Sequence, residues 1–266
     1  MNYFNCSLFI KKNIILTGAS GKIGSMIANY FDKNKSNLIL VDKDISKLEK
    51  KYKKNNRRLK SNIKVYKCNF ENENERKKIF SKISKENKNI DLVINNAAFV
   101  GDSNLSGWNT SFEKQSIETW NRCINVNLTS VFDLIKVLNN GKNFSNNSSI
   151  INISSIYSFL APDKNLYKNT KINNPAAYSV SKSGLNYLTK WLAVELAPKV
   201  RVNSISLGGV KRLQEKKFLN KYIKDTPLKR MAVEKDILGS LIYLGSNLSS
   251  YITGQNIIID GGKSLP

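Results

Sequence analysis

Short runs of apolar residues recur along the whole chain, and the segments between them are longer and amphipathic. Each run has four to seven residues, and several are too apolar to leave one face of a strand in water. Runs of this kind are typical of strands buried on both faces of a sheet. We predict seven strands: Asn13–Thr17, Asn37–Val41, Asn62–Tyr66, Asp91–Asn95, Ser148–Ser154, Val200–Ser206 and Asn256–Ile259.

Helical patterns separate these strands, at about residues 22–33, 45–56, 73–87, 115–140, 176–197 and 233–245. Parallel neighbours require right-handed crossovers, and helices of this length supply them on both faces of a sheet. The pattern therefore predicts an α/β fold, a doubly wound seven-stranded parallel sheet of the Rossmann type. No linker divides the chain, so we expect a single domain over residues 1–266, with an N-terminal extension at 1–12 and an insertion at 157–174.

The chain contains no histidine, which excludes a histidine-based triad, a histidine general base and a histidine metal ligand. Its three cysteines, Cys6, Cys68 and Cys123, show no CxxC spacing. Thiols in this number and arrangement predict a reduced, cytoplasmic setting without a metal site. Any acid–base chemistry must then come from other side chains or from a cofactor.

Basic residues outnumber acidic ones by 43 to 20, which gives a net charge of +23. The densest basic run, residues 47–64, has few aromatic residues and no nucleic-acid-binding motif, so we interpret it as a solvated helix face and expect no nucleic-acid partner. Residues 1–12 lack the features of a signal peptide, and no run of 18 apolar residues predicts a membrane span. A positive field does favour anionic substrates or cofactors.

A glycine-rich loop directly follows the first predicted strand and leads into a helix. It reads TGASGKIG, with glycines at 18, 21 and 24. Glycines at such places let the backbone turn sharply and approach a pyrophosphate, whose charge then lies at the helix N-terminus. The position between a strand and a helix makes this motif more specific than three glycines alone.

Asp42 ends the second predicted strand, 24 residues after Gly18. An acidic residue there accepts hydrogen bonds from the adenosine ribose and repels a 2′-phosphate, which favours NAD over NADP. Lys22 and Lys43 act in the opposite sense, so NADP stays open. The alternative role of Asp42 is to stabilise the turn before Ile45.

Tyr178 and Lys182 are spaced i and i+4 in the helix predicted at 176–197, so both side chains lie on one face. A phenol with a reference pKa near 10 is a poor acid–base group at neutral pH. A nearby ammonium group stabilises the phenolate and lowers the pKa, so we expect a tyrosine that exchanges a proton with an alcohol or a carbonyl.

In its ordered motifs the chain resembles the short-chain dehydrogenase/reductase family over nearly its whole length. The similar segments are TGASGKIG at 17–24, Asp42, Asn95-Asn96-Ala97-Ala98, Asn127 in NVNLTSVF, Ser155 in NISS, Tyr178 and Lys182 in YSVSK, RVNSISLGG at 201–209 and YITGQNIIIDGG at 251–262.

This resemblance implies hydride transfer at a nicotinamide. Tyr178 would be the general acid–base, and Lys182 would lower its pKa and hold the nicotinamide ribose. Ser155 would bind the reacting oxygen, and Asn127 would support a water-mediated proton relay near Lys182.

The resemblance also implies the cofactor contacts. Asn95 and Ala97 would line the adenosine side, Asn69 would reach the adenine amino group, and Gly208 with Val210 would pass close to the nicotinamide. The full set is Gly18, Ser20, Gly21, Lys22, Ile23, Gly24, Asp42, Asn69, Phe70, Asn95, Ala97, Tyr178, Lys182, Gly208 and Val210.

The chain also departs from the common family pattern. Lys22 stands where the most common loop has a glycine, and the spacing follows the TGxxGxxG form of the extended branch. Leu207 replaces a proline and Ala98 a glycine, which puts local loop geometry in doubt. Ser155 and Tyr178 lie 23 residues apart, more than in many relatives, so we expect the insertion to cover the mouth of the site.

The insertion and its flanking motifs are similar to oxidoreductases that modify flagellin or surface polysaccharide. That similarity implies a sugar or activated sugar as the small-molecule substrate. Lys164, Lys168 and Lys171 in the insertion would suit an anionic sugar derivative, or they simply solvate the loop. The family also implies a homodimer or homotetramer packed through helices 115–140 and 176–197, with Trp120 and Trp191 at the interface or in the core.

We therefore expect an oxidoreductase that transfers hydride between NAD, or NADP, and an alcohol or ketone. One alternative is an epimerase or dehydratase of the extended branch that retains its NAD. Another is a dinucleotide-binding regulator without turnover.

Overall fold

The computed structural model describes residues 8–53, 62–100, 105–170 and 173–265. Residues 1–7 of the expected extension, 54–61 of the basic run, and Lys171 of the insertion lie outside this described part.

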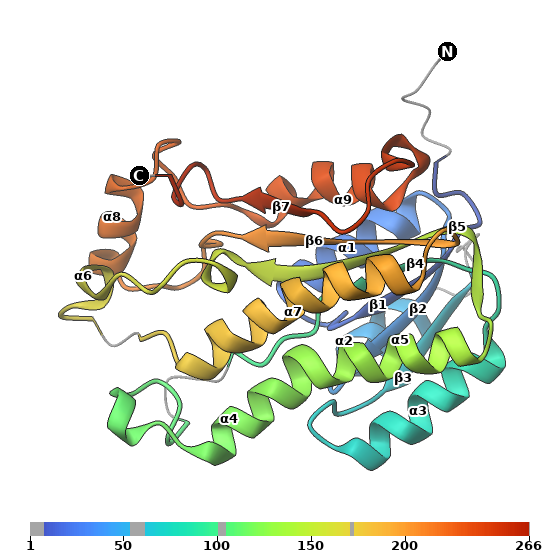
Figure 1. Cartoon of the computed structure of the whole chain (residues 1–266), viewed down its shortest axis with the longest axis horizontal. Coiled ribbons are helices and arrows are strands. Elements are labelled where there is room, and N and C mark those ends of the chain that lie inside the picture. The colour runs from blue at the N-terminus through green and yellow to red at the C-terminus, as the bar shows by residue number, and fades with distance from the viewer. Residues whose placement is uncertain (1–7, 54–61, 101–104, 171–172, 266) are drawn as a thin grey trace.

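Seven parallel strands form one sheet, as Figure 1 shows, in the order β3-β2-β1-β4-β5-β6-β7. The predicted doubly wound fold and its single domain are confirmed. The carboxyl ends of all strands therefore meet at one edge, and the order reverses between β1 and β4, where ligands bind in such sheets. The strands are β1 Asn13–Thr17, β2 Asn37–Asp42, β3 Ile63–Lys67, β4 Ile90–Asn95, β5 Phe144–Ser155, β6 Val200–Leu207 and β7 Asn256–Ile259.

Helices cover both faces of the sheet, and each face buries its own apolar cluster. Ile15, Val93 and Ile150 point to one cluster, whereas Ile14, Leu92 and Ile151 point to the other, as the alternation along a strand requires. The first face carries α3 Glu73–Glu86, α4 Ile117–Ile124, α5 Ser130–Asn140 and α7 Ala176–Glu195. The second carries α1 Lys22–Lys33, α2 Ser46–Lys53 and α9 Leu238–Gly245.

The helix predicted at 115–140 is not continuous. A π-helical turn at Asn125–Thr129 separates α4 from α5, so this prediction was wrong. Such a turn widens the helix locally and changes the direction in which later side chains project. Here it holds Asn127 in the interior, where its side chain meets α7 and the loop after β4.

Two short helices lie beyond the carboxyl ends of β5 and β6 (Figure 1). The first is α6, Lys164–Tyr167, inside the insertion, and the second is α8, Lys216–Lys224, which the strand and helix pattern did not predict. Lys221 Nζ joins them, because it donates hydrogen bonds to the carbonyl oxygens of Asn165 at 2.7 Å and Lys168 at 2.8 Å. Together they bury a third, small apolar cluster of Leu166, Phe218, Tyr222 and Met231.

None of the helices in the described ranges is long and apolar enough to cross a membrane.

Candidate active site

The glycine loop packs directly on the strand that follows the switch in sheet order. Gly18 has a φ of +65°, and a Cβ there would lie 2.7 Å from the Cα of Ala97. A Cβ on Gly24 would lie 2.0 Å from the carbonyl oxygen of Gly18. Both contacts are with backbone that cannot move aside, so only glycine fits these two positions. The loop thus reaches the N-terminus of α1 at Lys22 with its backbone exposed for a phosphate.

Two cavities lie side by side at this edge of the sheet. One has a volume of about 690 Å³ and contains Ser155, Tyr178 and Lys182 in its wall. The other has a volume of about 510 Å³ and contains the glycine loop and Asp42. They share lining residues, namely Ile23, Asn96, Ala98 and Val100. A long ligand that lies across this shared wall can therefore reach both the loop and Tyr178.

The smaller cavity collects most of the residues that the sequence assigned to the adenosine end of a dinucleotide. These are Gly18, Gly21, Lys22, Ile23, Gly24, Asp42, Asn69, Phe70 and Ala97. A pyrophosphate fits this cavity for two reasons. The glycines leave space where a side chain would stand, and the N-terminus of α1 favours a negative charge. Lys22, Lys43 and Arg212 add positive charge to the same wall.

Asp42 has backbone contacts through both of its carboxylate oxygens. Oδ2 accepts a hydrogen bond from the amide of Ser20 at 2.8 Å, and Oδ1 accepts one from the amide of Asp44 at 3.1 Å. The carboxylate therefore stabilises the glycine loop and the turn after β2. Each oxygen keeps a second lone pair, so the same group can also accept a ribose hydroxyl. Ser20 contributes its amide to this arrangement and does not belong to the wall of either cavity.

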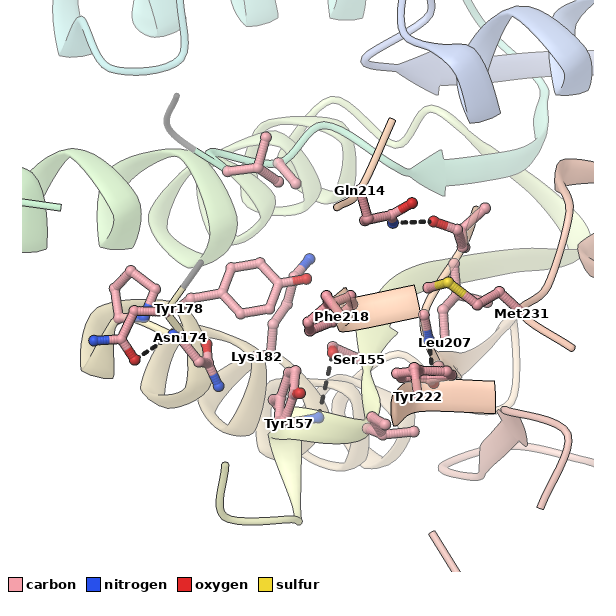
Figure 2. Close-up of a pocket in the computed structure, with 18 of the residues that line it drawn as sticks. Ser155, Tyr157, Asn174, Tyr178, Lys182, Leu207, Gln214, Phe218, Tyr222 and Met231 are labelled. Carbon is pink, nitrogen blue, oxygen red and sulfur yellow. Dashed lines mark hydrogen bonds between the residues drawn. The ribbon is translucent and has the colours of Figure 1, made fainter. Parts of the chain in front are cut away.

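Ser155, Tyr178 and Lys182 converge in the larger cavity, as Figure 2 shows. Ser155 ends β5, and the other two lie one turn apart on α7. Lys182 is 2% exposed, and its Nζ donates a hydrogen bond to the carbonyl oxygen of Ile153 at 2.8 Å. The same Nζ lies 5.9 Å from the centre of the Tyr178 ring. Gly208 and Val210, after β6, line the same cavity.

Burial is the largest influence on the pKa of both Tyr178 and Lys182. It raises the pKa of Tyr178 to about 12, and the hydrogen bond with Ser155 acts in the opposite direction. It lowers the pKa of Lys182 to about 8. The sequence led us to expect that the ammonium group would lower the pKa of Tyr178. The structure differs, because desolvation disfavours the phenolate more strongly than its surroundings stabilise it.

Two residues assigned from the sequence lie elsewhere. Asn95 is 3% exposed and donates its side-chain amide to Asn152 at 2.8 Å, so its side chain joins β4 to β5 instead of lining the adenosine side. Asn127 is 1% exposed, accepts a hydrogen bond from the amide of Phe99 at 2.6 Å, and donates to Ser181 at 2.9 Å. These side-chain contacts brace the loop after β4 against α7. The Asn127 amide also donates to Cys123 Sγ at 3.3 Å.

The structure also brings in residues that the sequence reasoning missed. Four aromatic residues, Tyr157, Tyr167, Phe218 and Tyr222, line the larger cavity together with Ser155. Phe218 and Tyr222 come from α8, whose amphipathic sequence KKFLNKYIK was a readable helical signal. Arg212, on the smaller cavity, is paired with Glu234 at 2.7 Å.

The part of the chain that the structure describes holds no cluster of three or more acidic or cysteine side chains arranged to bind a metal ion.

Comparisons with known proteins give relatives that match nearly the whole chain. A family model described as Enoyl-(Acyl carrier protein) reductase matches residues 18–264. A 3-oxoacyl-acyl-carrier-protein reductase of Buchnera aphidicola is 33% identical over 261 residues, which cover 96% of this chain and 98% of the relative. Post-translational flagellin modification protein A of Campylobacter coli is 32% identical over 267 residues, with 96% and 98% covered.

Among solved structures, a short chain dehydrogenase from Leptospira borgpetersenii with bound NAD+ superposes with a TM-score of 0.83. It is 33% identical, and the match covers 100% of this chain and 98% of that one.

The lowered pKa of Lys182 predicts a pH dependence of stability. The pKa falls from 10.5 to about 8 on folding, so between these values the unfolded chain binds more protons than the folded one. The free energy of unfolding of the wild type relative to Lys182→Met should therefore rise by about 1.4 kcal/mol per pH unit above pH 8. Denaturant unfolding of both proteins from pH 7 to 9.5 measures this difference. If the free energies of unfolding of the two proteins changed equally with pH, the lowered pKa of Lys182 would be contradicted.

Proposed function

Because the chain belongs to the short-chain dehydrogenase/reductase family of NAD(P)-dependent oxidoreductases, we propose that it interconverts an alcohol and a ketone on a sugar derivative, with NAD as the preferred cofactor. The observation that carries the proposal is the convergence of Tyr178, Lys182 and Ser155 in a cavity that shares lining residues with the cavity of the glycine loop.

The residues of the larger cavity have distinct roles in this reaction. A bound nicotinamide supplies a hydride to the carbonyl carbon, or accepts one in the reverse direction. Tyr178 donates its phenolic proton to the carbonyl oxygen during reduction and takes the hydroxyl proton during oxidation. Ser155 donates a hydrogen bond to the same oxygen and so holds it beside the phenol. Lys182, one turn after Tyr178 on α7, binds the nicotinamide ribose.

The residues of the smaller cavity hold the other end of the cofactor. The backbone between Gly18 and Gly24 binds the pyrophosphate, and Asp42 accepts hydrogen bonds from the adenosine ribose. Asn69 and Phe70 border the adenine, and Gly208 and Val210 border the nicotinamide. Asn127 serves as a positioning residue, because it braces the loop that carries Ala97 and Ala98.

Two observations support a sugar derivative as the substrate. One relative is named a post-translational flagellin modification protein, which is the kind of oxidoreductase whose resemblance implied a sugar substrate. The larger cavity is also lined by amide and phenol side chains that hydrogen-bond hydroxyl groups, including Asn174 and Gln214. Lys164 and Lys168 of the insertion are exposed and do not line this cavity, which removes the support that they gave to an anionic substrate.

We also propose that the face formed by α5 and α7 binds a second copy of the chain. Phe132, Tyr187, Trp191 and Val194 are 42%, 70%, 50% and 82% exposed on it, whereas Trp120 packs against the core. A hollow of about 350 Å³ lies between the two helices. An apolar face of this kind can pair with itself across a two-fold axis, as in a homodimer or homotetramer.

The exchange of Tyr178 for phenylalanine tests the catalytic proposal. Tyr178→Phe removes the proton that the reaction needs and keeps the ring, so kcat should fall about 10²–10⁴-fold while the affinity for NAD stays nearly unchanged. Tyr251→Phe, on a fully exposed tyrosine, is the matched control and should keep full activity. Initial rates at the absorbance of reduced nicotinamide, with calorimetric NAD titration, give both values. Retained turnover in Tyr178→Phe would remove this residue from the mechanism.

The cofactor preference depends on the charge of Asp42. NAD should bind more tightly than NADP, and Asp42→Asn should reduce this ratio at least about tenfold, since it removes a charged acceptor that also repels a 2′-phosphate. Titration of both proteins with both dinucleotides measures the ratio. If the wild type preferred NADP, the proposed role of Asp42 would be contradicted, and Lys22 or Lys43 would determine the cofactor preference.

The proposed self-association can be tested by one charge on the apolar face. Trp191→Glu should convert the oligomer into monomers, because a buried unpaired carboxylate opposes association. Val233→Glu, on an exposed residue next to α9, should leave the oligomer intact. Sedimentation velocity reports the mass of each protein. A monomeric wild type, or an unchanged mass in Trp191→Glu, would contradict the proposal.

A further inference from the structure

Aromatic side chains form one wall of the larger cavity. Tyr157 comes from the turn after β5, Tyr167 from α6, and Phe218 and Tyr222 from α8. The rings of Tyr167 and Phe218 are 5.8 Å apart between centres, and those of Phe218 and Tyr222 are 6.1 Å apart. The amide of Gly209 donates to the Tyr222 hydroxyl at 2.5 Å, which fixes α8 to the turn after β6. The wall is therefore a connected structure that holds its hydroxyl groups in place.

The hydroxyls of Tyr157 and Tyr167 are hydrogen-bonded to each other within this wall. Burial raises the pKa of both phenols, so both stay protonated at neutral pH. Two phenols carry two protons, and their mutual bond uses one of them. In the described part of the chain no other group accepts a hydrogen bond from the second hydroxyl proton, and both oxygens keep free lone pairs. The pair can thus donate one hydrogen bond and accept another.

The charges around the pair narrow the chemistry of its partner. Among the described residues that line this cavity, Lys182 and Glu215 are the only charged side chains. Lys182 already donates to Ile153, and the lining residues that the structure describes include no cluster of cations that would bind a phosphate or a carboxylate. A neutral group that both accepts and donates uses the full capacity of the pair. An alcohol hydroxyl does this, whereas a ketone or thioester oxygen only accepts.

The pair lies close to the reacting groups. Tyr157 is two residues after Ser155 in the chain, its amide donates to Ser155 Oγ at 3.2 Å, and Figure 2 shows Tyr157 beside Ser155 and Lys182. Aromatic faces of Phe218 and Tyr222 complete the same wall and suit the C–H face of a sugar. A group bound by the pair must then belong to the part of the substrate that adjoins the reacting carbon.

We propose that the Tyr157–Tyr167 hydroxyl pair is a specificity determinant that binds a substrate hydroxyl near the reacting carbon. The substrate class is therefore a polyhydroxylated ketone or its alcohol, and simple ketones and 3-oxoacyl thioesters are poor substrates. This inference rests on the proposed oxidoreductase function and extends it from a reaction type to a recognised functional group.

A substrate series separates the pair from the catalytic groups. The probes are ketopentoses and ketohexoses, each compared with the 2-alkanone of the same chain length, and an acetoacetyl thioester, all with NADH and NADPH. For the wild type, kcat/KM should be higher for the sugar than for the alkanone. In Tyr157→Phe and in Tyr167→Phe this ratio should fall at least about tenfold, the effect of one lost hydrogen bond to a substrate.

Controls distinguish recognition from damage to the fold. The double variant should lose no more than either single variant, because both hydroxyls act as one unit. Tyr251→Phe, on a fully exposed tyrosine, should leave the ratio unchanged. Dinucleotide affinity and the thermal midpoint should be retained in Tyr157→Phe and Tyr167→Phe. If one of them does not fold, the other still reports the ratio.

Three results would overturn the inference while the proposed function stands. They are equal use of the sugar and the alkanone by the wild type, a ratio that neither phenylalanine variant changes, and a preference for the acetoacetyl thioester. Failure of the proposed function looks different: the wild type binds the dinucleotide and turns over none of the three carbonyl classes.

Discussion

The hydrogen bond from Lys182 Nζ to the carbonyl oxygen of Ile153 anchors the reactive end of the molecule. A buried ammonium group is unfavourable unless it has a partner, and here the partner belongs to the central strand β5. The bond joins α7 to β5 at Ile153, two residues before Ser155. Tyr178 lies one turn from Lys182 on α7 and therefore faces the end of the same strand. The relation between Ser155, Tyr178 and Lys182 thus depends on how one helix lies on one strand.

Backbone constraints at the other end of the site have a comparable role. Gly18 and Gly24 leave no room for a side chain against Ala97 and against each other, so the loop lies flat on the sheet edge. Asp42 holds the amide of Ser20 and so links the end of β2 to this loop. The two cavities share a wall because both form at the carboxyl ends of strands in one parallel sheet. The fold therefore places the glycine loop and Tyr178 in neighbouring cavities at one edge of the sheet.

Much of the architecture could be predicted from the sequence, since buried parallel strands require continuous apolar runs. β1 and β7 have the predicted bounds, whereas β5 begins four residues earlier, at Phe144 instead of Ser148, because an irregularity in its pairing with β4 extends it. The π-helical turn at Asn125–Thr129 was not predictable, because a local widening of a helix leaves its apolar pattern nearly intact. Helix α8 had a visible pattern and was overlooked.

The structure brings the predicted residues Ser155, Tyr178 and Lys182 into one cavity, but it gives them an environment that the sequence did not predict. Spacing placed Tyr178 and Lys182 on one helix face, but the direction of a pKa shift depends on depth of burial, which spacing does not reveal. Asn95 is the last residue of β4, two residues before Ala97. The alternation of side chains along the strand directs the Asn95 side chain to Asn152. Tyr157 and Tyr167 meet because α6 brings Tyr167 back to the turn after β5, and no pattern in the sequence indicates this contact.

A crystal structure of the chain with NAD+ tests the account most directly. The account predicts the nicotinamide ring in the cavity of Ser155, Tyr178 and Lys182, with the Tyr178 hydroxyl directed at the space beside its C4 atom, and the adenosine beside Asp42. A dinucleotide bound in the reverse direction, or bound so that Tyr178 points away from the nicotinamide, would contradict it.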